Sequence, residues 1–365
     1  MRTACAFFVA LLFVLVPQSL VAQTIIRVDA DASAPGDGTS WGSAYPALQD
    51  AFDEANANAG TDYEIWIAEG TYYPDVDNVD NDGDGSTEHT ADADASFTLN
   101  RDGVEVYGGF SGGETSRSAR DPSANVVTLS GDIAGDDDPF APNTDTDGDS
   151  STPTQTDHIN KPNATHVVDL NGRSGENITG NTVVGGLTIT GGHTDGGTFP
   201  ANVGGGLLCD GGQSGNECSA TLSNLTFEGN FAYAGGALIS VAEKGGLSNP
   251  TLTDVTFRAN ASSQFGGAIY NDAGDGSQGG TASPSVSGGS FSNNVAASGG
   301  AIFNEATGGT ANMSISNTTF ENNSASTAGG ALYIYCDQGA TSNPQITGTD
   351  FLSNTANFGG AMYAY

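Results

Sequence analysis

The chain has 365 residues, enough for one large or two ordinary domains, and its 9 Lys and Arg against 43 Asp and Glu give a formal net charge of -34. A surface this acidic repels nucleic acid and anionic membranes, so neither is an expected partner. The 53 glycines follow no three-residue period, which excludes a collagen-like chain.

Residues 1–22 are typical of a secretory signal peptide. Arg2 supplies the positive end, an apolar run occupies residues 7–16, and the small Ala22 precedes the expected cut before Gln23. The apolar run is too short to span a bilayer comfortably, and no second such run follows. We therefore expect a secreted protein, extracellular or on the outer cell surface, with no membrane span in this chain.

Residues 23–74 contain the expected start of the folded domain. Apolar patterning predicts strands at residues 25–28 and 63–68, with an amphipathic helix between them at residues 46–56. The apolar residues of that helix fall at positions i, i+3, i+4 and i+7, namely Leu48, Ala51, Phe52 and Ala55. We expect this strand–helix–strand segment to be an N-terminal cap that shields the first coil of a β-stack.

Residues 75–182 combine the first coils with two polar, Asp-rich insertions at 75–94 and 132–162. Each insertion contains alternating acidic residues that match the opening of a calcium-binding loop. The candidate calcium ligands are Asp80, Asp82, Asp84, Asp145, Asp147 and Asp149. Neither loop has the closing Glu at position twelve, where Ala91 and Thr154 stand, so solvated acidic loops are the alternative interpretation.

From residue 183 to residue 365 the chain repeats itself. A Phe is followed by an Asn three residues later in five copies, which are 30, 34, 29 and 31 residues apart, and each copy precedes Gly-Gly-Ala and an aliphatic residue or Met. The pairs are Phe227 and Asn230, Phe257 and Asn260, Phe291 and Asn294, Phe320 and Asn323, and Phe351 and Asn354. Five paired copies indicate a structural repeat of roughly thirty residues.

Each repeat contains short, alternating segments rich in β-branched residues, such as residues 252–257, and no apolar face long enough for a helix. The sequence therefore predicts an all-β fold, a right-handed parallel β-helix (solenoid) in which equivalent residues stack about 4.8 Å apart. We expect the Phe residues to stack inside this solenoid. We expect Asn260, Asn294 and Asn323 to form a side-chain ladder at a turn, where Asn tolerates left-handed geometry. The paired Gly residues supply positive φ or room at a bend.

The repeat region has two further features. Cys209 and Cys218 flank a short polar loop, and we expect them to form a disulfide in an oxidising compartment. The sequence ends at Tyr365 inside a repeat, so we expect the coils at 183–365 to lack a C-terminal cap. Either the sequence is truncated there or a partner covers the last coil.

The paired repeat motifs resemble those of the polymorphic outer-membrane proteins, a group of bacterial surface β-helices. The amino-terminal part resembles secreted bacterial β-helix proteins of the pectin-lyase-like class. The residues that carry this second resemblance are Trp41 and the segments at 65–72, 107–110, 129–132 and 187–192. The first resemblance implies adhesion at a cell surface. The second implies a fold rather than an activity, because this fold hosts lyases, hydrolases and adhesins alike.

No catalytic constellation stands out in the sequence. Arg258 occupies a variable position of its repeat that is expected to face solvent, and Asp254 and Asp350 precede their Phe by different offsets and form no column. We therefore predict a non-enzymatic secreted or surface protein that binds a polysaccharide or cell-surface ligand, or serves as a structural spacer. The alternative is a polysaccharide lyase or glycoside hydrolase acting on acidic polysaccharide. A groove with aromatic residues and a carboxylate pair on one coil face would favour the enzyme, whereas flat Ser, Thr and Asn faces would favour binding or spacing.

The acidity of the chain has two explanations, a high-salt habitat and calcium binding. Acidic residues occur along the whole chain and only two Lys are present, which favours the high-salt habitat. We predict that the melting temperature rises with salt, because the Debye length shrinks from about 10 Å at 0.1 M to about 3 Å at 1 M. Thermal melts at several sodium chloride concentrations measure this effect, and a flat or falling melting temperature would contradict the high-salt explanation.

Calcium is the one cofactor that the sequence suggests. Three carboxylates from each insertion supply part of the six to eight oxygens that calcium requires, so carbonyls and water must complete the shell. We predict weak binding, with a Kd on the order of 10⁻⁴–10⁻³ M, as in extracellular modules. Calorimetric titration should give heat with the wild type and less with the Asp82→Ala, Asp147→Ala double variant. Equal heats in the two proteins would leave the insertions as solvated loops.

Overall fold

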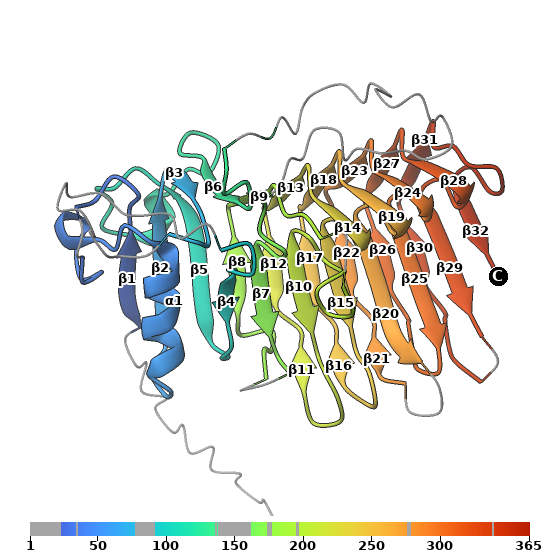
Figure 1. Cartoon of the computed structure of the whole chain (residues 1–365), viewed down its shortest axis with the longest axis horizontal. Helices are drawn as coiled ribbons and strands as arrows, with labels where there is room; N and C mark the ends of the chain where they lie inside the picture. The colour runs from blue at the N-terminus through green and yellow to red at the C-terminus, as the bar shows by residue number, and fades with distance from the viewer. Residues whose placement is uncertain are drawn as a thin grey trace, which may run out of the picture.

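The coils of the chain stack into a right-handed parallel β-helix, which confirms the predicted fold class (Figure 1). The structure, a computed structural model, describes residues 23–33, 36–76, 92–135, 137, 162–173, 177–194, 197–275, 279–337 and 339–365. Successive coils add parallel strands to three long sheets, and each strand pairs with its equivalents in the coils before and after it.

Three long sheets enclose the core. In order, the first sheet contains β1 (Thr24–Val28), β2 (Tyr63–Ala68), β5 (Val104–Phe110), β8 (Val183–Gly185), β12 (Thr221–Ser223), β17 (Thr251–Thr253), β22 (Ser285–Ser287), β26 (Ser314–Ser316) and β30 (Gln345–Thr347). The second sheet contains β4 (Phe97–Leu99), β7 (Val168–Asn171), β10 (Leu207–Asp210), β15 (Leu238–Val241), β20 (Ile269–Asp275), β25 (Ile302–Thr307), β29 (Leu332–Cys336) and β32 (Met362–Ala364). The third sheet contains β3 (Gly70–Tyr72), β6 (Val127–Ser130), β9 (Thr188–Thr190), β13 (Thr226–Glu228), β18 (Thr256–Arg258), β23 (Ser290–Ser292), β27 (Thr319–Glu321) and β31 (Asp350–Leu352).

Two smaller sheets and two short turns complete the described elements. One small sheet contains β14 (Phe231–Ala234), β19 (Ala261–Phe265), β24 (Val295–Ser298) and β28 (Ser324–Ala328). The other contains β11 (Glu217–Cys218), β16 (Leu247–Ser248) and β21 (Thr281–Ala282). The short turns are the 3-10 helices η1 (Trp41–Ser43) and η2 (Arg117–Ala119).

The predicted N-terminal helix and its apolar face are confirmed. Helix α1 (Leu48–Ala57) begins two residues later and ends one residue later than predicted, and it buries the four predicted side chains Leu48, Ala51, Phe52 and Ala55. The helix packs on β1, β2 and β4, at the N-terminal ends of the first and second sheets (Figure 1). Phe52 meets Phe97 edge to face, with ring centroids 6.5 Å apart. The helix therefore covers the apolar interior where the coil stack begins.

The predicted Phe column is confirmed as the centre of the core. Consecutive ring centroids lie 4.9, 4.6, 4.6 and 5.0 Å apart, from Phe227 through Phe257, Phe291 and Phe320 to Phe351. The ring planes are within 11° of parallel. The first four rings are fully buried, and Phe351 is partly buried in the last described coil. Because the rings of successive coils are in contact, the apolar core is continuous along the solenoid axis.

The predicted Asn ladder is also confirmed, and it extends beyond the three residues named above to Asn230 and Asn354. From Asn230 to Asn323, each Nδ2 donates to the Oδ1 of the Asn in the next coil at 2.9–3.1 Å. The Oδ1 of each later Asn also accepts the backbone N–H of the Asn in the coil before it, at 2.9–3.1 Å. The buried amides are therefore satisfied by their own copies, which avoids the free-energy cost of an unpaired polar group.

The left-handed conformation lies one residue earlier than the sequence suggests. The residue before each ladder Asn has a positive φ, 54° at Ala259 and 55° at Asn293, whereas the ladder Asn does not. This placement turns the ladder side chain inward and leaves its backbone N–H free to bond to the next amide. The first Gly of each Gly-Gly-Ala also has a positive φ, 61° at Gly266, as predicted.

Truncation of one ring of the Phe column should destabilise the solenoid strongly. We expect Phe291→Ala to lower the free energy of unfolding by about 3–5 kcal/mol, because the fully buried ring leaves a cavity between two others. Urea denaturation measures this change. The matched control is Ser292→Ala, one residue later on the outer surface, which should change stability by less than about 0.5 kcal/mol. If Phe291→Ala lowered the free energy of unfolding by less than about 1 kcal/mol, the ring stack would not be a main source of stability.

Candidate functional site

The residues proposed as calcium ligands, Asp80, Asp82, Asp84, Asp145, Asp147 and Asp149, lie outside the described residues. Within the part of the chain that the structure describes, no group of three or more His, Cys, Asp or Glu side chains is placed to hold a metal ion. The calcium hypothesis therefore stays a prediction for the two Asp-rich insertions.

Cys209 and Cys218 are joined by a disulfide, with their Cα atoms 5.6 Å apart. The bond links β10 to β11 inside one coil. In the next coil the equivalent residues are Ser240 and Ser248, whose hydroxyl oxygens lie 2.9 Å apart. The disulfide therefore occupies a position where a neighbouring coil uses a hydrogen bond, which indicates a role in stabilising the coil.

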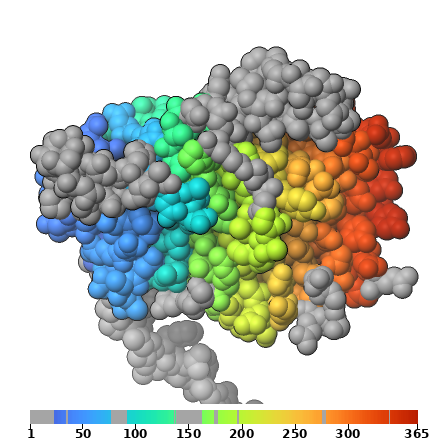
Figure 2. Space-filling view, viewed as in Figure 1, coloured from blue at the N-terminus to red at the C-terminus, as the bar shows by residue number. Residues whose placement is uncertain are grey.

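Aromatic side chains line the outer face of the second sheet towards its C-terminal end. We name the aromatic strip as Tyr270, Phe303, Tyr333 and Tyr363 on the second sheet, together with Phe265 on β19 of the adjoining small sheet. The ring centroids of Phe265 and Phe303 lie 4.7 Å apart, those of Phe303 and Tyr333 also 4.7 Å, and those of Tyr333 and Tyr363 5.1 Å. This face is turned to the viewer in Figures 1 and 2, where β20, β25, β29 and β32 run from orange to red.

The geometry of the aromatic strip determines what it presents to solvent. Phe303 is buried between its neighbours, and the other four residues are partly exposed. Phe303 and Tyr333 are stacked within 11° of parallel, so their faces cover each other and their edges point outward. Tyr side chains combine a rigid apolar ring with a hydroxyl group, which suits them to surfaces that are apolar and wet at once. The strip is therefore a rigid, amphipathic surface along the solenoid axis.

A pair of carboxylates adjoins the aromatic strip. Asp272 on β20 and Glu305 on β25 are register partners on neighbouring strands. The Tyr270 hydroxyl donates a hydrogen bond to Glu305 Oε2 at 2.5 Å. Burial, followed by the charge of Glu305, raises the pKa of Asp272 to about 7, and Glu243 adds to the effect. Close to neutral pH, Asp272 therefore exchanges a proton beside a second carboxylate.

A second carboxylate pair lies further back on the same sheet, and a cation neutralises it. Arg173 donates to Asp210 Oδ2 at 2.8 Å and to Asp169 Oδ2 at 3.1 Å. Burial raises the pKa of Asp169 to about 6, against the opposing effect of Arg173. A cavity of about 190 Å³ next to this pair is lined by Arg173, Asp210, Phe199 and Lys244, among others.

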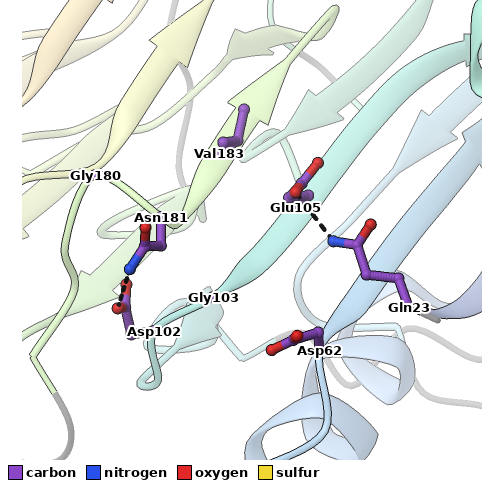
Figure 3. A pocket seen from close by; sticks show the side chains of 8 residues that line it. All are labelled: Gln23, Asp62, Asp102, Gly103, Glu105, Gly180, Asn181 and Val183. Atoms are coloured by element: carbon purple, nitrogen blue, oxygen red, sulfur yellow. Dashed lines mark hydrogen bonds between the residues drawn. The ribbon is translucent and has the colours of Figure 1, made fainter. Parts of the chain in front are cut away.

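Another cavity lies at the other end of the chain, on the first sheet (Figure 3). It has a volume of about 560 Å³ and is lined by Gln23, Asp62, Asp102, Gly103, Glu105, Gly180, Asn181 and Val183. Figure 3 shows Gln23 extended towards Glu105, to which its Nε2 donates at 2.9 Å. This cavity is polar and acidic, and it has no aromatic lining residue.

The sequence did not single out Tyr270, Asp272 or Glu305, although a signal was present. Each lies one or three residues after the apolar residue that ends a Gly-Gly-Ala motif, such as Ile269. Because side chains alternate across a strand, these positions face outward when the apolar residue faces inward. Tyr270, Phe303, Tyr333 and Tyr363 all directly follow the apolar residue after Gly-Gly-Ala. Comparison of this position among the repeats predicts that the four side chains form one outward-facing column.

The fold defines the protein as a repetitive parallel β-helix whose outer surface differs from one face to another. A repeat model, the Chlamydia polymorphic membrane protein repeat, matches residues 254–272, 288–305 and 317–335. Each matched segment contains one Phe-x-x-Asn motif and the Gly-Gly-Ala motif that follows it. The expected resemblance to this repeat is thus confirmed over part of the chain.

Other comparisons gave no further relative. No curated protein and no solved structure matches the chain, so the likeness to pectin-lyase-like proteins stays an expectation. None of the helices in the described part of the chain has the length and apolarity that a membrane crossing requires.

The raised pKa of Asp272 predicts a pH-dependent stability. An unfolded Asp has a pKa of about 3.9, whereas burial raises that of folded Asp272 to about 7. The folded state holds this proton more tightly, so the contribution of Asp272 to stability falls as the pH rises from about 4 to about 7. We expect Asp272→Asn to raise the melting temperature at pH 8 by about 2 °C or more, and to have little effect below pH 4.

The control for this prediction is Asp350→Asn, which removes one exposed carboxylate from the third sheet. Thermal melts of the three proteins between pH 4 and pH 8 separate the effect of Asp272 from the general effect of the net charge. Parallel curves for wild type and Asp272→Asn would contradict a perturbed Asp272.

Proposed function

We propose that this protein is a surface-displayed or extracellular adhesive β-helix that binds a polysaccharide along the aromatic strip. The observation that carries the proposal is the unbroken run of ring contacts from Phe265 to Tyr363, in which Phe303 and Tyr333 are stacked and the other pairs are tilted. The Tyr270 hydroxyl and Glu305 supply polar groups at the strip. Sugar rings have apolar C–H faces and polar rims, which complement rigid amphipathic Tyr side chains. The similarity to polymorphic membrane protein repeats supports a location at a cell surface.

Charge narrows the class of polysaccharide. The strip is bordered by Asp272 and Glu305, and the chain carries 43 acidic residues against 9 basic ones. A polyanionic sugar chain would be repelled by such a surface at low salt. A neutral or amino-sugar polymer therefore fits this face better than an acidic one.

A second candidate function is glycoside hydrolysis, and the pair of Asp272 and Glu305 favours it. Glycoside hydrolases use two carboxyl groups, one protonated and one ionised, on either side of the scissile bond. Asp272 has the raised pKa of an acid, and Glu305 is its register partner. A lyase has less support, because Arg258 is an exposed residue in an ion pair with Glu228.

A spacer function has its own structural support on another face. The outer face of the first sheet carries columns of small hydroxyl residues, which are partly or fully exposed. They are Thr221, Thr251, Ser285 and Ser314 in one column, and Ser223, Thr253, Ser287, Ser316 and Thr347 in the other. From β12 to β26 this face carries only Ser and Thr in these two columns, unlike the aromatic strip.

Binding to insoluble polysaccharides tests the proposed function. We expect the wild type to be retained by a neutral polymer such as cellulose or mannan, or by an amino-sugar polymer such as chitosan, and less by alginate. Tyr333→Ala should weaken binding at least about tenfold, the equivalent of 1.4 kcal/mol. The control Leu352→Ala truncates an exposed apolar residue of the third sheet and should bind like the wild type.

The outcome also discriminates among the candidate functions. Equal binding by wild type and Tyr333→Ala would remove the aromatic strip as the binding surface. New reducing ends that disappear in both Asp272→Asn and Glu305→Gln would favour the hydrolase. Failure to bind any polymer in the panel would favour the spacer.

A further inference from the structure

The cavity of Figure 3 surrounds the residue at which the signal peptide is expected to end. We propose that this cavity receives the α-ammonium group of the processed chain, which begins at Gln23, and that removal of the leader creates an ion pair with Asp62. Processing would thereby fasten the first strand to the rest of the solenoid. This inference is independent of the polysaccharide proposed above, because it concerns the opposite end of the coil stack.

The strand register places the new terminus beside Asp62. On β1, Thr24 is the register partner of Tyr63 on β2, so Gln23 lies next to Asp62, one residue earlier on each strand. The Thr24 N–H donates to the backbone oxygen of Asp62 at 2.8 Å. The side chains of Gln23 and Asp62 both line the cavity, as Figure 3 shows.

The side chain of Gln23 is already held in the cavity. Its Nε2 donates to Glu105 Oε1 at 2.9 Å, and Glu105 lies on β5, the strand beyond β2. The other oxygen of Glu105 accepts from the Tyr107 hydroxyl at 2.7 Å and from Arg117 at 2.6 Å. Gln23 therefore connects the first strand to the third strand of the sheet through a carboxylate that is itself fixed.

Asp62 is the carboxylate with capacity left for a cation. Although burial raises the pKa of Asp102, hydrogen bonds from Thr179, Asn181 and Thr182 lower it overall, so Asp102 stays ionised and fully engaged. Among the described residues, the exposed carboxylate of Asp62 has no hydrogen-bond or ion-pair partner. Three carboxylates thus line the cavity, and the one closest in register to the new terminus is free.

Cleavage changes the charge at this point. Before cleavage the nitrogen of Gln23 is a neutral peptide amide, and after it the same nitrogen carries a positive charge among Asp62, Asp102 and Glu105. Nearby carboxylates stabilise an ammonium group, so they raise its pKa above the value of about 7.7–8.0 that is ordinary for an α-amine. Because Asp62, Asp102 and Glu105 all line this cavity, the added cation reduces the repulsion among them.

The hydrogen bond between Gln23 and Glu105 also opposes a reaction that would remove the positive charge of the terminal amine. An N-terminal Gln can cyclise when its α-amine attacks its own side-chain Cδ. The N–Cδ bond then forms, the Cδ–Nε2 bond breaks, and ammonia leaves, so the product is a neutral lactam. In the fold, the side chain of Gln23 is extended towards Glu105 and its amide is held there by a hydrogen bond, which opposes the bending that ring closure requires. The folded chain should therefore retain an open Gln23 with its positive charge.

The test uses the full chain with its own leader, exported by a bacterial host. N-terminal sequencing and intact mass should show a chain that begins at Gln23 and has not lost ammonia. The pH dependence of acylation of the terminal amine should give a pKa about one unit above the ordinary value. In Asp62→Asn at least half of this shift should disappear. The matched control Asp350→Asn removes one exposed carboxylate from the last coils and should keep the full shift.

Each other outcome overturns the inference. If the processed chain began at a different residue, Gln23 would carry no α-ammonium group and the cavity could not receive one. An unshifted amine pKa, or equal shifts in Asp62→Asn and Asp350→Asn, would show that the amine does not pair with Asp62. Cyclisation should be at least about tenfold slower in the native protein than in concentrated urea, and equal rates would contradict the protection of Gln23.

Discussion

Contact between identical side chains at the spacing of parallel strands is the interaction on which the rest of the structure depends. Neighbouring strands lie about 4.8 Å apart, and the Phe rings of successive coils lie 4.6–5.0 Å apart, which is van der Waals contact between stacked rings. The Asn amides use the same spacing to donate and accept between coils. A coil can therefore join the stack without a cavity and without an unpaired buried amide.

Because these inner columns hold the coils together, the outer positions are free to differ from coil to coil. On the second sheet one outer column changes from Leu208 and Ile239 to Tyr270, Phe303 and Tyr333. On the first sheet two outer columns remain Ser and Thr from β12 to β26. Such a scaffold can present a binding surface on one face while another face stays plain, and neither choice disturbs the core.

Three arginines in the described part of the chain lie beside carboxylates that the fold partly buries. Arg173 joins Asp169 and Asp210, Arg117 joins Glu64 and Glu105, and Arg258 joins Glu228. Removing a carboxylate from water costs free energy unless it is paired or protonated. Asp272 has no Arg or Lys partner within the described residues, so its raised pKa is the remaining way to reduce its charge. Asp272 beside the aromatic strip thus differs from the carboxylates that an Arg neutralises, because its own protonation reduces its charge.

The periodic parts of this protein follow from its amino-acid sequence alone. The Phe, Asn and Gly-Gly-Ala repeats specify the coil, and the apolar face of the helix specifies the cap, because both depend on local spacing and on burial that recurs in every copy. The sequence could not place the left-handed residue at Ala259 rather than Asn260, since that choice depends on which way the amide must point to reach the next coil. Nor could it bring Gln23 beside Asp62 and Glu105. Those residues are far apart in the chain or follow no repeated motif, and strand register, a tertiary property, decides which of them meet.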